Sequence, residues 1–261
     1  MRLPLAALLI LLCSAPGARA QDESDLARKT QNPISDLISV PFEYTHGHDF
    51  ARQDRSQNVL NIKPVYPMEL EGDFNMITRT IMPLIYQPEL TRSGRNSGFG
   101  DLQFTAWLTP KNSDVLWGLG PVALFPTASD DELGTGKISL GPSAVLVVMD
   151  GPWVLGGLAQ NLFSVAGDGG RRGVNQMLIQ PFINYNMGDG WYLVSTPLVT
   201  ANWKADGPDV WTLPVGGGIG RVVHFGDSPI NLRTQAFYNV AKPKVGPRWS
   251  LQFQVQLLFP K

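Results

Sequence analysis

The stretch WSLQFQVQLLF, from Trp249 to Phe259, alternates apolar and amide side chains. In an extended strand successive side chains point to opposite faces, so Leu251, Phe253, Val255, Leu257 and Phe259 would share one face, and Gln252, Gln254, Gln256 and Leu258 the other. Such a strand suits a wall between lipid and water. Near the end of an exported chain it is typical of the assembly signal of an outer-membrane β-barrel. A soluble sandwich shows the same alternation, so the rest of the chain must discriminate.

The start of the chain resembles an export signal. Met1 and Arg2 form a short positive region, an apolar stretch follows over 3–12, and Ala18-Arg19-Ala20 matches an A-x-A cleavage site. We therefore predict a signal peptide over 1–20, with the mature chain starting at Gln21. A lipoprotein signal at Cys13 is the alternative, but Leu12 is large where such a site needs a small residue. Cys13 is the only cysteine, so the mature chain would contain no disulfide.

Composition favours a β-rich wall. Charged residues make up 16%, aromatic residues 10%, and the 27 glycines and 21 prolines suit turns and bends better than helices. After the signal, no apolar run approaches the roughly 18 residues that a transmembrane helix needs. The formal net charge of −1 and the lack of a basic run argue against nucleic acid as a partner.

Reading the chain with a period of two predicts about twelve strands. They cover 37–44, 57–66, 74–85, 98–108, 115–125, 137–149, 153–165, 174–187, 191–203, 210–225, 230–240 and 249–259. An even number fits a closed antiparallel barrel whose termini lie on one side. The strands 137–149 and 153–165 are apolar or glycine-rich on both faces, so they would lie against a plug or give the lumen an apolar side.

The connections alternate between long and short, as in outer-membrane barrels with long outer loops and short periplasmic turns. Starting from a periplasmic amino terminus, the long ones include 45–56 and 87–97, and the tight ones 150–152 and 188–190. Aromatic residues gather near both strand ends, where rings prefer the lipid headgroup zone. We therefore predict an all-β fold: signal peptide 1–20, a periplasmic leader or plug over 21–36, and a barrel of about 12 strands over 37–261.

Parity also predicts which polar side chains face inward, because charges on the lipid side would cost roughly 2 to 4 kcal/mol each at mid-bilayer. Lys63 and Arg79 could form a network with Glu43 and Asp101, either as mutual neutralisation or as part of a conductive path. The candidate pore-lining residues are Glu43, Lys63, Arg79, Asp101, Gln103, Gln180, Asn184, Asn202, Arg233, Gln235 and Gln254.

Motifs for catalysis or metal binding are sparse. His46 and His48 fall in the first predicted outer loop and lack a third ligand, so a solvated loop is favoured over a metal site. An outer-membrane lipid hydrolase would pair a histidine with a serine two residues on, which none of the three histidines, His224 included, has. The glycines at 216–218 and 220 lack a following Lys-Ser/Thr and read as a strand segment that allows close packing. Asp130-Asp131-Glu132 reads as a solvated loop tip. We expect no enzyme activity, cofactor or metal.

Several segments resemble one family over nearly the whole mature chain. They are NPISDLISVPFE from Asn32, NVLNIKPVYP from Asn58, ITRTIMPLIYQP from Ile77, GFGDLQFTAWLTP from Gly98, WGLGPVALFPTA from Trp117, MDGPWVLGGLAQNLFSVAGD from Met149, PFINYNMGDGWYL from Pro181 and WSLQFQVQLLFPK from Trp249. They look like the MetA-pathway of phenol degradation family, whose members are often labelled "transporter" or "neuromedin U". One departure is that Pro260 and Lys261 follow the terminal aromatic residue.

The resemblance implies an outer-membrane barrel of Gram-negative bacteria that passes aromatic or other apolar compounds. The expected partners are outer-membrane lipid, the barrel-assembly machinery and a small-molecule solute, with a monomeric barrel. About twelve strands lie between a filled eight-stranded barrel and an open sixteen-stranded channel, so passage would be narrow or gated. An envelope-structural barrel without transport is the main alternative, and a lipid hydrolase the weaker one.

Overall fold

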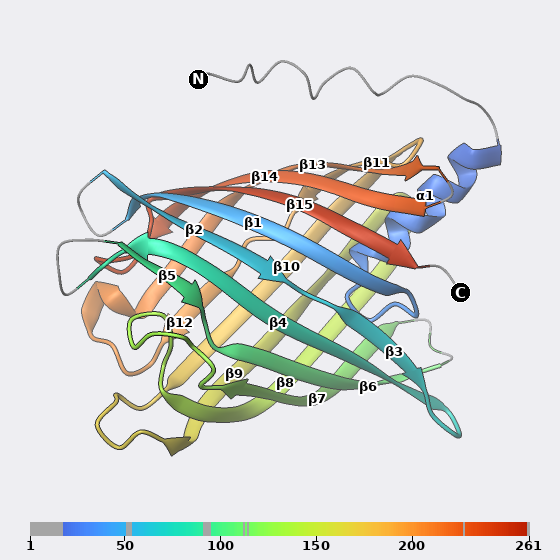
Figure 1. The fold of residues 1–261 in the computed structure, drawn as a ribbon. Coiled ribbons are helices and arrows are strands. Elements are labelled where there is room, and N and C mark those ends of the chain that lie inside the picture. Colours follow the sequence, from blue (N-terminus) through green and yellow to red (C-terminus); the bar gives the residue numbers. More distant parts are fainter. Residues whose placement is uncertain are drawn as a thin grey trace.

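The computed structural model describes residues 18–50, 54–90, 95–111, 113, 115–226 and 228–259. The predicted signal peptide lies outside the described residues, apart from its last three, with which α1 (Ala18–Gln31) begins. A short 3-10 turn covers Gly207–Val210, and the other regular elements are strands (Figure 1). Neither helical element in the described part of the chain has the length and apolar character to cross a membrane.

Antiparallel strands form one sheet that closes on itself. The closing pairs are β1 with β15, from Ile38↔Phe259 to His48↔Trp249, and β9 with β10. Three strand pairs, β2 with β3, β5 with β6 and β11 with β12, each share one position in the wall, so the fifteen strands make a closed barrel of twelve wall positions, as predicted. The strands are β1 (Ile38–Phe50), β2 (Arg55–Ile62), β3 (Val65–Glu69), β4 (Phe74–Pro88), β5 (Arg95–Phe99), β6 (Leu102–Pro110), β7 (Leu116–Phe125), β8 (Lys137–Asp150), β9 (Trp153–Gly167), β10 (Asn175–Gly188), β11 (Trp191–Ser195), β12 (Val199–Asn202), β13 (Trp211–Phe225), β14 (Ser228–Ala241) and β15 (Trp249–Phe259).

The divided wall positions differ from the continuous strands that the sequence predicts. Two of the breaks contain a proline, Pro64 between β2 and β3 and Pro197 between β11 and β12. Proline has no backbone N–H to give to a ladder, which explains why pairing stops there. The first break stays attached to its neighbours, because Lys63 N donates to Pro41 O at 2.9 Å and Thr80 N to Pro64 O at 3.1 Å.

Exposure along the strands is the reverse of that in a water-soluble protein. In β15 the side chains of Phe253 and Val255 are 50% and 44% exposed, whereas Gln254 and Gln256 are 7% and 6% exposed. A folded chain in water buries its large apolar residues and keeps amides outside. An apolar outer surface around a polar interior is the pattern of a transmembrane barrel.

The two ends of the barrel differ, as Figure 1 shows. Tight connections after β8, β10 and β13 lie at the end where α1 and the carboxyl terminus are found. At the other end, β1 runs to Phe50 and β4 to Pro88. Residues 45–50 and 55–56 of the first predicted loop, and residues 87–88 and 95–97 of the second, are therefore strand, which corrects the sequence interpretation. Exposed aromatic side chains near both ends fit the predicted bands, with Phe99, Phe125 and Tyr238 at one end and Tyr66, Phe74 and Trp153 at the other.

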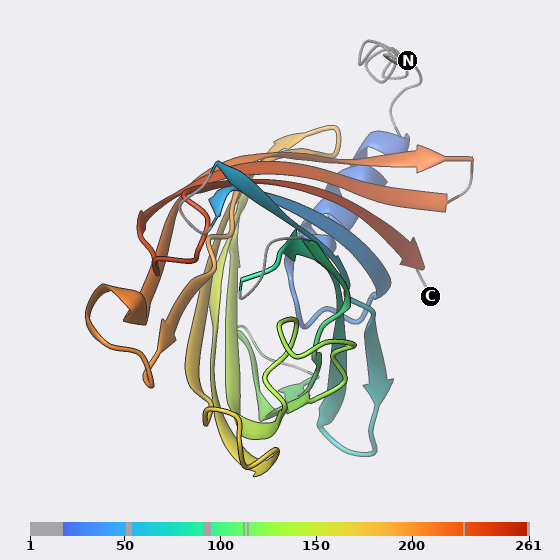
Figure 2. The same ribbon diagram turned by 60° about the vertical axis from the view of Figure 1, so that its left-hand side comes forward.

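The space inside the barrel holds two clusters of buried side chains. One joins Ile34 to residues of β4, β6 and β8 to β10, namely Ile77, Trp107, Val145, Val147, Val154, Leu158 and Phe182. The other joins Leu26 and Ala27 of α1 to Leu37, Tyr192, Val194, Val222 and Leu258. The amino-terminal segment therefore packs against the inner wall, and Figure 2 shows α1 beneath the strands at its end of the barrel.

Candidate functional site

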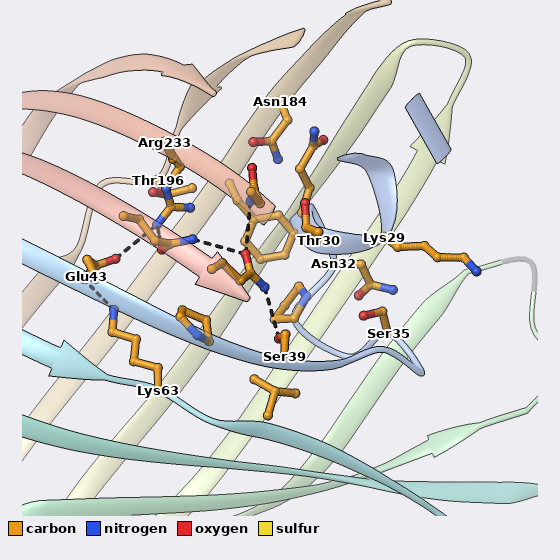
Figure 3. A pocket seen from close by; sticks show the side chains of 18 of the residues that line it. Lys29, Thr30, Asn32, Ser35, Ser39, Glu43, Lys63, Asn184, Thr196 and Arg233 are labelled. Carbon is orange, nitrogen blue, oxygen red and sulfur yellow. Dashed lines mark hydrogen bonds and ion pairs between the residues drawn. The ribbon is translucent and has the colours of Figure 1, made fainter. Parts of the chain in front are cut away.

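The barrel interior contains a cavity of about 130 Å³ that opens to solvent. Its wall comes from strands far apart in the sequence, and its floor from residues 29–33 and Ser35 of the amino-terminal segment (Figure 3). Four basic side chains and one carboxylate line it: Lys29, Lys63, Arg79, Arg233 and Glu43. The cavity is therefore electropositive.

Glu43 is the centre of the charged group. Its side chain is buried, and its two oxygens accept from Lys63 Nζ at 2.5 Å and from Arg233 Nη2 at 3.1 Å. Arg233, Gln254 and Glu43 stand in one register row across β14, β15 and β1, because Arg233 pairs with Gln254 and Gln254 with Glu43. Lys63 reaches the same carboxylate from the break between β2 and β3. One buried carboxylate thus connects three wall segments.

A chain of hydrogen bonds continues from this group along the inner wall. Arg233 Nη2 donates to Gln254 Oε1 at 2.6 Å, and Gln254 Nε2 donates to Gln256 Oε1 at 3.2 Å. Gln256 Nε2 donates to Ser39 Oγ at 3.1 Å. The same Gln256 Oε1 accepts from Asn231, whose own carbonyl oxygen accepts from the Tyr192 hydroxyl at 2.7 Å. We call these residues, with Glu43 and Lys63, the polar arc.

A second group of amides lies beside the polar arc. Gln235 Oε1 accepts from Thr196 N and Thr196 Oγ1, both at 3.1 Å, and Gln235 Nε2 donates to Gln252 Oε1 at 3.3 Å. Thr196 occupies the break between β11 and β12. Buried polar groups are costly unless they are hydrogen-bonded, so this bonding makes an amide-rich interior stable.

The facing part of the wall is apolar. Trp107, Val145, Val147 and Leu158 are each less than 4% exposed, and they pack together with Ile34. Phe182 joins them because Gly156 leaves room for its ring: a Cβ at Gly156 would lie 2.3 Å from Phe182 Cε2. Leu158 and Phe182 also line the cavity. We call the eight side chains of this cluster, defined above, the apolar arc. The sequence expectation that strands 137–149 and 153–165 face something apolar agrees with these contacts.

Arg79 stands at the boundary between the two arcs. Its guanidinium carbon lies 4.9 Å from the centroid of the Trp107 ring, in a cation–π contact. Trp107 is itself held by a hydrogen bond from Nε1 to Ser143 Oγ at 2.9 Å. Arg79 Nε is buried without a hydrogen-bond partner, and no hydrogen bond or ion pair joins the guanidinium to a described residue. Arg79 therefore presents to the cavity a cation that no described residue pairs.

Two side-chain contacts fix α1 at the end with the tight turns. His224 Nδ1, near the end of β13, lies 3.1 Å from Glu23 Oε1. Gln31 and Asn186 exchange amide hydrogen bonds of 2.8 and 3.2 Å. Beyond the helix, Asn32 Oδ1 accepts from Ile34 N at 3.0 Å, which makes the turn that sends Ile34 toward the apolar arc.

The candidate pore-lining residues divide into two sets. Glu43, Lys63, Arg79, Gln180, Asn184, Arg233 and Gln254 line the cavity. The other four lie elsewhere, Gln235 being in the second amide group and Gln103 accepting from Gln160 Nε2 at 3.2 Å. Asp101 instead holds the loop between β7 and β8, accepting from Thr135 N at 2.6 Å and Ala128 N at 3.2 Å. Asn202 is exposed and accepts from Lys204 N at 3.1 Å.

The sequence analysis predicts a loop at His46 and His48, but both residues lie in β1, which extends to Phe50. His46 contacts Asn58 at 2.8 Å, and His48 pairs with Asp54 at 3.0 Å and stacks near Trp249. The glycines of β13 allow close packing, since a Cβ at Gly220 would lie 2.2 Å from the Tyr192 ring. In the described part of the chain, no three His, Cys, Asp or Glu side chains gather as metal ligands.

Sequence reasoning missed several residues of the site. Tyr192, Asn231 and Ser39 belong to the polar arc, and Thr196 to the amide group beside it. Parity along β11 and β14 could have found Tyr192 and Asn231, since each shares the inward face of its strand. Thr196 carries no such signal because it lies in a break.

No protein-family model matches the sequence, and no curated protein matches it. Among solved structures, the fold is similar to that of the COG4313 outer membrane channel from Pseudomonas putida F1, with a TM-score of 0.67 and 17% identity over 86% of this chain and 96% of that one. Weaker likenesses include outer membrane phospholipase A from Escherichia coli, with a TM-score of 0.44 and 13% identity over 92% and 98%, and a Pseudomonas aeruginosa FadL homologue, with 0.45 and 12% over 87% and 76%. The first likeness shows the fold, and the other two support no inference.

Proposed function

We propose that this protein is an outer-membrane barrel that lets small apolar or aromatic compounds cross passively. The observation that carries the proposal is the interior cavity, which has an apolar arc with Trp107, Leu158 and Phe182 beside a polar arc around Glu43. Sites for small molecules are typically concave and mostly apolar, with a few placed polar groups. The apolar outer surface and the amide-rich interior support placement in a membrane.

The proposal includes the orientation and the family. Short turns face the periplasm in bacterial outer-membrane barrels, which would place α1 on the periplasmic side. The likeness in fold to an outer membrane channel and the sequence segments that resemble the MetA-pathway of phenol degradation family support the same interpretation. An export signal over 1–20, removed on translocation, and a monomeric barrel inserted by the assembly machinery belong to this proposal.

We further propose that residues 21–36 act as an interior plug that sets the rate of passage. The support is that Leu26 and Ala27 are buried against the wall, that Ile34 enters the apolar arc, and that residues 29–33 floor the cavity. A solute that crosses the barrel would have to pass between this segment and the inner wall.

The test is solute entry into liposomes that contain the refolded mature protein. Entry of p-toluamide, a neutral aromatic compound, is compared with entry of a small sugar. We expect faster entry of the aromatic compound than into protein-free vesicles, and a further increase when residues 21–31 are deleted. Leu26→Ser, which weakens the packing of the same helix without removing it, should give a smaller increase.

Two outcomes would contradict the proposal. One is a folded barrel, shown by its heat-dependent mobility on a gel, that admits neither solute in the full-length or deleted form. The other is a protein that stays soluble without detergent and is absent from outer-membrane fractions. The first outcome would favour the alternative of an envelope-structural barrel, which the packing of α1 and Ile34 inside the barrel specifically supports.

A further inference from the structure

We propose that the barrel selects solutes that carry a carboxylate on an aromatic or aliphatic body, and that Arg79 binds that carboxylate. The inference rests on the proposed function, and it adds a chemical class of solute and a binding residue.

The first step is the state of Arg79. Arg79 lines the cavity, and its guanidinium carbon lies 4.9 Å from the Trp107 ring centroid; the guanidinium has no hydrogen bond or ion pair to a described residue. Arg79 pairs in register with Thr105, whose hydroxyl oxygen is also buried and unpartnered. Buried polar groups are nearly always hydrogen-bonded, so two orphans on facing residues call for an explanation. A bound anion on the guanidinium would supply the missing partner.

The second step is the charge of the cavity. Glu43 is the single carboxylate among its lining residues, and it is already engaged by Lys63 and Arg233. It cannot also neutralise Arg79 at hydrogen-bond distance. The remaining positive charge lies in an interior of low dielectric, where an anion is attracted much more strongly than in water.

The third step is the shape of the group that fits. The five N–H donors of a guanidinium form a planar fork that matches the two oxygens of a carboxylate. Beside Arg79, the indole of Trp107 keeps one face of the guanidinium covered, so a ligand would approach along the edge of the fork. Val65, Leu158 and Phe182 line the same cavity and provide an apolar surface for the body of the solute.

The experiment compares p-toluate with its neutral isostere p-toluamide, binding each to the full mature protein in detergent by isothermal titration calorimetry. We expect p-toluate to bind at least about tenfold more tightly, which corresponds to about 1.4 kcal/mol. Arg79→Gln should remove that preference, and Arg79→Lys, which keeps the charge but not the fork, should retain part of it.

The matched control is Arg221→Gln. Arg221 also lies 4.9 Å from a tryptophan centroid, that of Trp191, and its Nε is also buried and unpartnered, but it does not line the cavity. This substitution should leave the preference for p-toluate unchanged. If Arg221→Gln reduced the preference as much as Arg79→Gln, the assignment to Arg79 would be overturned.

Equal binding of the two compounds to the unaltered protein would also overturn the inference, and this comparison needs no variant to fold. The outcome is separable from that of the proposed function, which is read from entry into liposomes. Entry of p-toluamide with no preference for p-toluate would support the channel function and contradict the carboxylate site. Selective binding of p-toluate with no entry of either compound would support the carboxylate site and contradict the channel function.

Discussion

Along β14, β15 and β1 the inner wall carries side chains that are joined by hydrogen bonds, whereas the apolar arc is held by packing, apart from the hydrogen bond from Trp107 Nε1 to Ser143 Oγ. In the polar arc, Glu43, Arg233, Gln254 and Gln256 each hold at least two partners. In the apolar arc, Leu158 and Val147 have contacts but no directional bonds. The stability of the polar arc therefore depends on each of its hydrogen-bonded residues, whereas the stability of the apolar arc depends on how completely its side chains fill the space between them.

The comparison teaches how one narrow interior can be both stable and able to accept a solute. A hydrogen-bonded row fixes the register of three strands and cannot yield without leaving charges unpaired. Side chains that are held only by packing can be displaced locally by an apolar solute of similar volume. The four predictions that follow test this contrast.

The largest effect is expected at Glu43. Glu43→Gln leaves Lys63 and Arg233 without a carboxylate in the barrel interior, and removing one partner of a buried ion pair typically costs about 3 to 5 kcal/mol. The free energy of unfolding is measured by denaturant titration of the protein in lipid vesicles. Glu71→Gln, in the exposed turn after β3, is the control and should change nothing. A loss below about 1 kcal/mol, the value of an exposed pair, would show that the polar arc does not depend on each member.

Leu158→Ala tests the apolar arc. Leu158 is 1% exposed, and emptying such a site costs about 2 to 5 kcal/mol, depending on how far the neighbours collapse. Because the cavity grows, entry of p-toluamide into liposomes should rise at the same time. The matched control is Leu155→Ala on the same strand, where the side chain is 38% exposed on the outer face. Equal losses for the two variants, or an unchanged rate of entry, would argue against the apolar arc as the path.

Gln31→Ala tests how α1 is attached to the wall. The change removes the reciprocal amide bonds with Asn186, and a net hydrogen bond is worth about 1 kcal/mol. We expect faster hydrogen exchange of the α1 amides with little change in exchange along β10. Asp25→Ala, on the exposed side of the same helix, should leave the exchange of α1 unaltered. Exchange that stays slow would show that packing of Leu26 and Ala27, without the amide pair, holds the helix.

The sequence predicts the wall better than the interior. Period-two alternation locates all twelve wall positions because the lipid side admits only apolar residues, and it shows the inward face of the strands other than 137–149 and 153–165. The alternation does not predict which inward-facing side chains contact one another. Arg233, Gln254 and Glu43 become neighbours through the registers of two strand pairs, and those registers depend on hairpins and on closure of the barrel.

Three other features differ from the sequence prediction, each for a different reason. The polar leader forms α1 because Leu26 and Ala27 find a wall to pack against, which its own residues do not reveal. The division of two wall positions did have a signal, since Pro64 and Pro197 interrupt strand patterns. Asp101 has the right parity for the lumen, but the loop between β7 and β8 folds back onto it and uses its oxygens.

The smallest effect is expected at an arginine–carboxylate pair that resembles the pair of Arg233 and Glu43 but is exposed to water. Arg248 Nε donates to Asp49 Oδ2 at 2.7 Å near the end of β1, and the two side chains are 55% and 31% exposed. The hydrogen bond to Asp49 raises the pKa of Arg248, so both groups stay charged over the whole neutral range. Water and salt screen such a pair, and long side chains lose conformational freedom when they are held in it.

Arg248→Gln should therefore leave the denaturation midpoint of the barrel within measurement error, at low salt and at high salt. Glu43→Gln, measured beside it, should destabilise the barrel at both salt concentrations, because the Glu43 side chain is buried and salt screens a buried pair much less than an exposed one. If the two variants instead responded to salt alike, burial would not be the cause of the difference between them, and the interior of the barrel would be as wet as its rim.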